Sequence, residues 1–367
     1  MTLTNYWWLL IWLFLGGAIF GRMPKCRERL NGEIVERWDI WPAIFMVLPY
    51  IVWAGFRGDI ADTYLYRIGF LKAETSMSAI LALFSDSTKE DVGYEIFVAV
   101  MRRIVGENAD LFFLIIAAIQ GLCMAMTFRR FSSNYWVCIF LFVASTDYMS
   151  WMMNGMRQFI AVTVIFACFD WMIQKKYIPL IFVILGASTF HQSALLMIPI
   201  IFIVQGEVWN YKTILMLVVT LAVVAFTDRF TPVLNDMLQN TNYDTVLGEE
   251  MLAWDDGTNF IRVLVYSVPA LLSLVGLRYV RSANDPVINV SVNCAIVTMA
   301  LYLVAMVTSG IYIGRLPIYT TLQGYIAVPW LVNNIFERRS AKFVMNLMVL
   351  LFCAFFYYQM FIAWNYG

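Results

Sequence analysis

The sequence predicts an all-α polytopic membrane protein, because of its composition, its long apolar segments and the placement of its charges. Hydrophobic residues make up 61% of the chain and charged residues 14%, with a mean hydropathy of +0.72. An average soluble domain has about 25% charged residues. Since a helix needs roughly 20 mostly apolar residues to cross a bilayer, the apolar segments predict about twelve transmembrane helices. We expect them to form a single integral membrane domain over residues 1–367.

The predicted transmembrane segments are separated by loops that contain charged or turn-forming residues. The first segment has no basic residue before it, which favours an uncleaved span over a removed signal peptide. The segments are residues 4–21, 40–55, 110–128, 134–150, 153–173, 177–190, 192–205, 212–228, 260–278, 286–308, 316–335 and 343–362.

Residues 177–205 are expected to form a short broken pair of helices. As one helix they would be about 43 Å long at 1.5 Å per residue, which is long for one span and short for two. Two short helices, 177–190 and 192–205, place the basic loops that follow on the same side of the membrane as the earlier basic loops. The break is predicted near Phe190-His191-Gln192. Irregular backbone at membrane depth is tolerated where it is buried in protein or lines a wet cavity.

Lysine and arginine are distributed unequally between the alternating loops. One set of loops contains 15 of the 25 basic residues and the other contains eight. Because cytoplasmic loops are enriched in Lys and Arg, the first set is assigned to the cytoplasm. The outer set then includes a long loop, 56–109, with amphipathic helices, and an acidic loop, 229–259.

Five basic or titratable residues at the ends of apolar segments converge on the outer side in this topology. They are Arg57, Arg157, His191, Arg262 and Arg315. Charge in a bilayer is costly, so such residues usually face a bundle interior or a water-filled cavity. The planar fork of arginine suits phosphate oxygens, and histidine suits general-base chemistry near neutral pH. The alternatives are contact of the arginines with lipid headgroups and a histidine that only packs between helices.

The long outer loop adds carboxylates and tyrosines beside Arg57. If the segment that begins at Gly58 is helical, Asp59, Asp62 and Tyr66 share one face. Together with Tyr64 they suit a hydroxyl-rich ligand such as a sugar. Glu95 opens an amphipathic stretch and is a further candidate carboxylate, although it also suits the N-terminus of a helix. The other interpretation is a solvated loop helix.

The chain offers little for metals, cofactors or nucleic acids. Its six cysteines form no Cys-x-x-Cys pair, and one histidine excludes a His-rich metal site. The net charge is zero, so no electrostatic attraction to nucleic acid is expected. We expect no cofactor and no metal site.

Five short motifs follow one another along the chain: GD-x-x-DT-x-x-Y from Gly58, GYE from Gly93, N-x-x-RQ-x-I-A from Asn154, A-x-x-FH-x-SAL from Ala187 and RL-x-x-Y from Arg315. Together they resemble the EpsG family, which is similar to Wzy-type polymerases of O-antigen, capsule and exopolysaccharide. The resemblance covers roughly residues 50–325. It implies a fold similar to the GT-C-like polysaccharide polymerases and ligases.

The resemblance also implies an activity, a location and partners. The enzyme would be a glycosyltransferase that moves a growing glycan from an undecaprenyl-diphosphate carrier to a lipid-linked repeat unit, at the outer face of the bacterial inner membrane. It would be surrounded by membrane lipids. Its expected protein partner is a chain-length-regulating co-polymerase. The predicted catalytic residues are His191 as base and Arg157 and Arg315 at the diphosphate. The predicted substrate-binding residues are Arg57, Asp59, Asp62, Tyr64, Glu95, Gln158, Ser193, Arg262 and Tyr319.

Three other functions are compatible with a polytopic membrane chain. A flippase or transporter for lipid-linked sugars would place its charges near the midplane, often in inverted repeats with paired broken helices, whereas here one broken pair and one charged face are predicted. A membrane acyltransferase of surface glycans would also use a histidine. It would typically have basic residues toward the cytoplasm, whereas the histidine of this chain is predicted to face outward. A purely structural subunit leaves the polar intramembrane residues unexplained.

Overall fold

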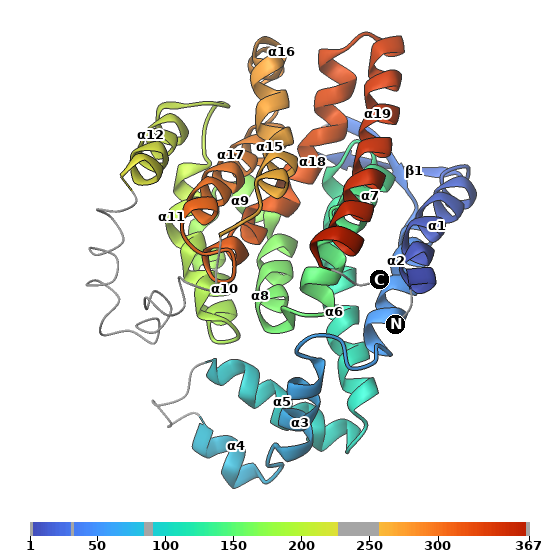
Figure 1. The fold of residues 1–367 in the computed structure, drawn as a ribbon, viewed down its shortest axis with the longest axis vertical. Helices are drawn as coiled ribbons and strands as arrows, with labels where there is room; N and C mark the ends of the chain where they lie inside the picture. Colours follow the sequence, from blue (N-terminus) through green and yellow to red (C-terminus); the bar gives the residue numbers. More distant parts are fainter. Residues whose placement is uncertain (1–2, 31–32, 84–90, 227–256, 365–367) are drawn as a thin grey trace. The chain divides into compact units, whose positions relative to one another are not determined.

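The computed structural model describes residues 3–30, 33–83, 91–226 and 257–364, and these are almost entirely helical (Figure 1). The chain forms two compact units. Unit 1 comprises Met1–Ile198 and Arg338–Gly367, and unit 2 comprises Pro199–Glu337. Most of the predicted acidic loop 229–259 lies outside the described residues, which resume at residue 257.

Unit 1 is built around α6, which packs against α2 and α8. Three of its helices begin at a side chain that caps the backbone, Asp39 for α2, Asn108 for α6 and Asn134 for α7. Such caps satisfy amide groups that a helix leaves free in its first turn. The helices are α1 (Leu3–Phe20), α2 (Ile40–Gly55), α6 (Ala109–Phe131), α7 (Tyr135–Ala144), the π-helix η1 (Tyr148–Met152), α8 (Met156–Ala167), α9 (Phe169–Ile173), α10 (Tyr177–Ser188), α19 (Arg338–Tyr357) and the π-helix η4 (Tyr358–Ala363).

The long loop 56–109 contains three short helices at one end of unit 1 (Figure 1). They are α3 (Thr63–Lys72), α4 (Met77–Leu83) and α5 (Val92–Val105). As expected for an amphipathic helix, α5 buries one face, which includes Tyr94 and Val98. That face packs in a core with Phe112 and Phe113 of α6. The loop is therefore fixed to the end of α6 and positions side chains there.

A β-hairpin lies between α1 and α2 and was not predicted. Strand β1 (Lys25–Leu30) pairs antiparallel with β2 (Glu33–Trp38), and Cys26 lies opposite Arg37. The sequence predicts an ordinary loop for this basic stretch, because its two strands contain few apolar residues. An isolated two-stranded hairpin is marginally stable in water, so its contacts with the rest of unit 1 must hold it.

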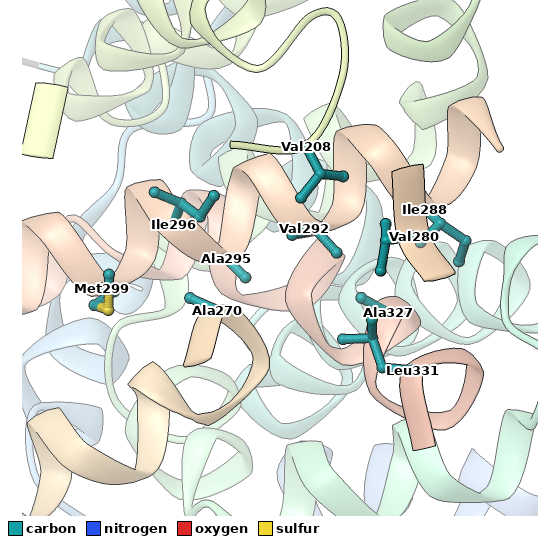
Figure 2. Packing of buried hydrophobic residues seen from close by; sticks show 10 residues of the cluster. All are labelled: Val208, Ala270, Val280, Ile288, Val292, Ala295, Ile296, Met299, Ala327 and Leu331. Carbon is teal, nitrogen blue, oxygen red and sulfur yellow. The ribbon is translucent and has the colours of Figure 1, made fainter. Parts of the chain in front are cut away.

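In unit 2, α17 is the central helix and packs against α12, α15 and α18. Figure 2 shows its core, in which Val292, Ala295 and Ile296 of α17 meet Ala270 and Ala327. Asp285 caps α17, and Pro286 occupies its first turn, where a missing amide hydrogen is harmless. The elements are α12 (Tyr211–Ala225), α15 (Phe260–Val275), α16 (Leu277–Ala283), α17 (Pro286–Val307), the 3-10 helix η3 (Ile313–Arg315) and α18 (Ile318–Ile335).

Every predicted transmembrane segment contains a helix, and the chain is an integral membrane protein. By length and composition, three described helices can cross a membrane: Ala109–Phe131, Pro286–Val307 and Arg338–Ala363. A fourth is added if α15 and α16, which meet at a bend of 73°, count as one span. Several of the other helices are shorter than the predicted segments; for example, the segment 153–173 is interrupted at Cys168 between α8 and α9. Twelve spans therefore remain a prediction.

The predicted helix break near His191 is present. Helix α10 ends at Ser188, and a 3-10 helix, η2 (Gln192–Leu196), begins four residues later and leads into α11 (Met197–Ile203). His191 itself has an extended backbone, with φ −160° and ψ 116°. The backbone N–H groups of Thr189, Phe190 and His191 donate back to carbonyl oxygens of Gly186 and Ala187, whereas the carbonyl oxygen of Thr189 accepts from another segment.

Candidate active site

Arg157, at the start of α8, is the centre of a polar and aromatic cluster in unit 1. Its Nη1 lies 3.0 Å from Oδ2 of Asp91. Its guanidinium also lies over two rings, 5.9 Å from the centroid of Tyr66 and 5.6 Å from that of Tyr94. Arg157 is half-buried, so this charge is partly removed from water. The N-terminus of α8 adds the positive end of a helix dipole, and the whole arrangement favours a negatively charged ligand.

Asp91 was not singled out from the sequence, although it makes the ion pair with Arg157. It has a left-handed backbone, φ 51° and ψ 40°, which aspartate tolerates better than most residues. It stands at the N-cap position of α5 but makes no side-chain cap. Its carboxylate, 9% exposed, reaches Arg157 instead. A carboxylate here occupies a position that an anionic ligand could take.

The two tyrosines of the cluster form an aromatic wall. The rings of Tyr66 and Tyr94 meet edge to face with centroids 6.2 Å apart. Burial raises the pKa of Tyr94, so its hydroxyl stays protonated at neutral pH. The predicted sugar-binding Tyr64 is 56% exposed. Positions 64 and 66 are about 200° apart around a helix, so only one of them can face Arg157, and that one is Tyr66.

The helix break at His191 is attached directly to this cluster. The backbone N–H groups of Gly93 and Tyr94 both donate to the carbonyl oxygen of Thr189, at 2.8 and 3.3 Å. A Cβ on Gly93 would lie 2.7 Å from the Cβ of Thr189, so only glycine fits. Two motifs distant in sequence, GYE and FH, are therefore held together, and the ring of Tyr94 contacts Arg157 from the same segment.

His191 is half-buried and is positioned by its own loop. Its Nδ1 lies 2.6 Å from Oγ of Ser193, another predicted site residue. With one ring nitrogen engaged by a hydroxyl, the other ring nitrogen can be presented in a fixed orientation. The preceding Phe190 packs against Phe97 of α5, with ring centroids 5.8 Å apart. These contacts fix the break against the loop helices.

Arg57 is fully engaged by the protein. It is 2% exposed, and its Nε donates to Oγ1 of Thr63 at 3.1 Å. Its Nη1 donates to the carbonyl oxygens of Ala54 at 3.0 Å and Met152 at 2.8 Å, and its Nη2 contacts Sδ of Met156. Burial lowers its pKa to about 10, so it remains charged at neutral pH. These bonds join the end of α2, the start of α3 and the turn before α8, which fits a positioning role better than direct contact with substrate.

The predicted carboxylates of the loop have different surroundings. Helix α3 begins at Thr63, so Asp59 lies outside it and does not share a helical face with Asp62 and Tyr66. Asp59 is exposed and pairs with Arg67 at 3.5 Å, whereas Asp62 is exposed at the helix start and makes no cap.

Glu95 and Gln158 lie next to residues of the Arg157 cluster but point elsewhere. Glu95 follows Tyr94 and lines a cavity of about 500 Å³ bordered by α3, α4 and α5, with Lys72 and Glu74 also in its wall. Gln158 follows Arg157 and is buried within unit 1.

The remaining predicted residues belong to unit 2. Arg262 is half-buried, with its guanidinium 5.5 Å from the ring centroid of Tyr266. Arg315 is exposed at the end of η3, and Tyr319 is buried in α18. Their convergence on His191 stays a prediction.

The part of the chain that the structure describes contains no group of three or more His, Cys, Asp or Glu side chains that could hold a metal ion.

Comparison with known protein families gives a match over most of the chain. The family model described as EpsG family matches residues 40–366, which include every candidate site residue discussed above. No curated protein and no solved structure matches the chain.

Proposed function

Since the chain belongs to the EpsG family, we propose that it is a polysaccharide polymerase, a glycosyltransferase of the Wzy type. Its donor would be a growing glycan on an undecaprenyl-diphosphate carrier, and its acceptor a second lipid-linked repeat unit. The site would open at the outer face of the bacterial inner membrane, as the basic residues of the loops predict.

The observation that supports this most is the cluster of Arg157 with Asp91, Tyr66 and Tyr94, joined through Thr189 to the segment of His191. Polymerisation needs a cation for a diphosphate leaving group and a base for a sugar hydroxyl. Here an arginine and a histidine are positioned by the same short segment, residues 91–94. The aromatic rings add apolar surface of the kind on which a sugar ring can pack.

In the proposed reaction, the acceptor hydroxyl oxygen forms a bond to the anomeric carbon of the donor sugar. The bond between that carbon and the diphosphate oxygen breaks, and its electron pair leaves with the lipid diphosphate. His191 takes the proton of the acceptor hydroxyl through the ring nitrogen not bonded to Ser193. Arg157 stabilises the negative charge that grows on the diphosphate, which is most effective where water is excluded.

Asp91 would act as a placeholder for the diphosphate. Its 3.0 Å ion pair with Arg157 keeps the half-buried guanidinium paired when no donor is bound. Donor binding would exchange one anion for another, so the charge of the site would change little. The cavity next to Glu95 has a volume of about 500 Å³, within the range of about 300–1,000 Å³ usual for ligand sites, and is the proposed place for sugars.

The experiment is a glycan ladder in a host from which the gene has been deleted. Wild type, Arg157→Gln and His191→Ala are compared with Arg103→Gln, which removes an exposed arginine of α5. We expect both site variants to lose the ladder, with a loss of at least about 100-fold in polymer, and the control to keep it. Protein levels are compared by blotting, and single repeat units should still be displayed outside.

Two results would contradict the proposal. Repeat units trapped on the cytoplasmic leaflet would indicate a flippase. A full ladder that lacks only a substituent would indicate a modifying enzyme such as an acyltransferase.

A further inference from the structure

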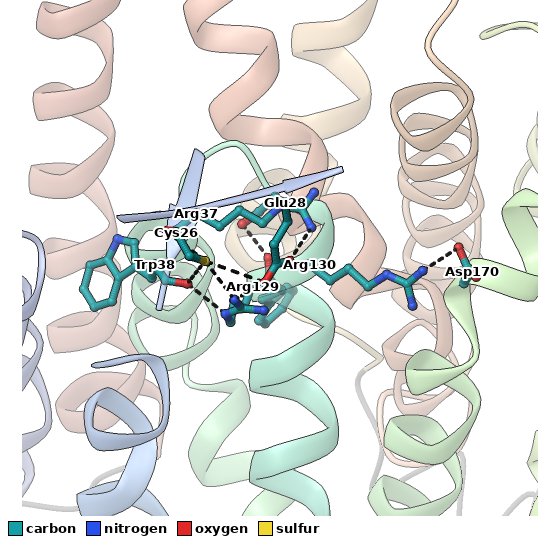
Figure 3. A network of polar contacts seen from close by, with 9 residues as sticks. Cys26, Glu28, Arg37, Trp38, Arg129, Arg130 and Asp170 are labelled. Atoms are coloured by element: carbon teal, nitrogen blue, oxygen red, sulfur yellow. Dashed lines mark hydrogen bonds and ion pairs between the residues drawn. The ribbon is translucent and has the colours of Figure 1, made fainter. Parts of the chain in front are cut away.

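A second polar network lies in unit 1, around the β-hairpin (Figure 3). Arg129, near the end of α6, donates through Nε to the carbonyl oxygen of Trp38 at 2.8 Å and through Nη2 to Sγ of Cys26 at 3.1 Å. Its Nη2 also forms an ion pair with Glu28. These contacts attach both strands of the hairpin to α6 and explain how so short a hairpin is held.

Next to this network is a cavity of about 270 Å³. Its wall includes three basic residues, Lys25, Arg37 and Arg129, and the hydroxyl-bearing Ser132. The N-terminus of α7 also contributes, with Trp136 in the wall. Helix N-termini present free backbone N–H groups and a positive dipole end, which favour phosphate. The cavity therefore combines three kinds of group that bind anions.

Arg37 is the most informative residue of this cavity. Its side chain is 5% exposed, and its Nε is buried without a hydrogen-bond partner among the described residues. Its ion pair with Glu28 is 3.7 Å long, beyond hydrogen-bond reach. A buried guanidinium normally has its donors satisfied, because an unpaired polar group in the interior costs about 1–3 kcal/mol. The Nε donor of Arg37 is therefore unused within the described part of the protein.

The carboxylates nearby do not neutralise the cavity. Glu28 is shared between Arg37 and Arg129, and Glu36, which also lines the wall, pairs with the exposed Arg27 at 3.4 Å. Lys25 forms no ion pair among the described residues. The basic residues in the wall of the cavity therefore outnumber its carboxylates.

The cavity lies at the opposite end of α6 from the candidate active site. Phe112 and Phe113, at the start of α6, pack with Tyr94, whereas Arg129 is in its last turn. A helix of 23 residues is about 34 Å long at 1.5 Å per residue, close to the thickness of a bilayer core. The distribution of basic residues assigns the hairpin end to the cytoplasmic side.

We propose that the cavity between the β-hairpin and the start of α7 binds a phosphate group, held by Arg37, Lys25 and the N-terminus of α7. The ligand class is a phosphate monoester or diester at the membrane surface, either a phospholipid headgroup or a soluble phosphate. This site is independent of the proposed polymerase reaction, since none of its residues belongs to the Arg157 cluster.

The test measures phosphate binding by the purified full-length protein. In one arm, inorganic phosphate is titrated in detergent at constant ionic strength, and binding is followed by calorimetry. In the other arm, native mass spectrometry measures how much protein retains phosphatidylglycerol compared with phosphatidylcholine. The variants are Arg37→Gln and, because Arg37 is buried and its loss could affect folding, Lys25→Gln, whose side chain is exposed.

Arg130→Gln is the matched control. Arg130 neighbours Arg129, and its substitution removes the same charge. Its side chain extends away from the cavity, and its Nη2 lies 3.2 Å from Oδ1 of Asp170 (Figure 3). We expect the dissociation constant to rise about tenfold in Arg37→Gln and several-fold in Lys25→Gln, and to stay the same in Arg130→Gln. That pattern with inorganic phosphate identifies a soluble ligand, and the same pattern with phosphatidylglycerol alone identifies a headgroup. Absence of binding in both arms, or equal weakening by Arg130→Gln, would overturn the proposal.

Discussion

The burial of Arg57 allows a sharp test of whether a charged residue at the end of a span binds substrate or holds the site together. The perturbation is Arg57→Met, which keeps a long side chain but removes every donor. The matched control is Arg67→Met. Both guanidinium groups lie over the ring of Phe113, at 4.7 and 5.3 Å from its centroid, but Arg67 is 27% exposed.

The magnitude follows from the bonds that each arginine makes. Removing Arg57 leaves the buried carbonyl oxygens of Ala54 and Met152 without this donor, while the hydroxyl of Thr63 keeps its bond to the carbonyl oxygen of Ile60. Each unpaired group costs about 1–3 kcal/mol, and part of this is offset because the charge no longer needs to be buried. We expect the free energy of unfolding to fall by about 3–5 kcal/mol. Arg67 makes exposed ion pairs, so its loss should cost about 1 kcal/mol or less.

The assay is unfolding of the purified protein in mixed micelles, with the midpoint followed by tryptophan fluorescence. Arg57→Lys is a further comparison, since it keeps the charge but loses the planar fork, and it should lie between wild type and Arg57→Met. The reasoning would be refuted if Arg57→Met unfolded no more easily than Arg67→Met while polymer formation was lost. Arg57 would then act on substrate directly.

Two further predictions follow from other contacts. Gly93→Ala would push Thr189 away from α5 and displace the helix break, so polymer length should fall although the protein is present at a normal level, as a glycan gel and a blot would show. The ion pair with Arg129 lowers the pKa of Glu28 below its ordinary value of 4.5, so its stabilisation is present above that pH and is lost as the pH falls through the lowered pKa. The protection of β1 and β2 against hydrogen exchange, corrected for the intrinsic pH dependence of amide exchange, should therefore fall below about pH 4.5, and Glu28→Gln should remove that acid-dependent step.

The helices could be predicted because each depends on local sequence, and the break was predicted from the length of residues 177–205 and from the basic residues of the later loops. Apolar segments of sufficient length become helices, and the polar run around His191 interrupts one of them. The hairpin could not be predicted in the same way. Its strands are rich in charged residues and lack a regular apolar–polar alternation, and it is held by Arg129, which is about 100 residues away in sequence.

Which residues make up the candidate site is decided by tertiary contacts and not by local sequence. Asp91 meets Arg157 across 66 residues of sequence, and nothing local distinguishes it from an ordinary cap of α5. Its position two residues before the GYE motif was the available signal. Likewise, the sequence shows that Arg57 follows a span, but only the structure shows that its donors are used within the protein. A charge next to a membrane segment indicates either binding or packing, and the partners decide between them.

The central claim is that the Arg157 cluster acts on a lipid diphosphate, and reconstitution tests it most directly. Purified protein is incubated with an undecaprenyl-diphosphate-linked repeat unit, and released lipid diphosphate and polymer length are measured together. We predict that wild type produces both, and that Arg157→Gln and His191→Ala lower both by at least about 100-fold without loss of fold. Equal rates in Arg157→Gln and wild type, with both proteins folded, would contradict the account.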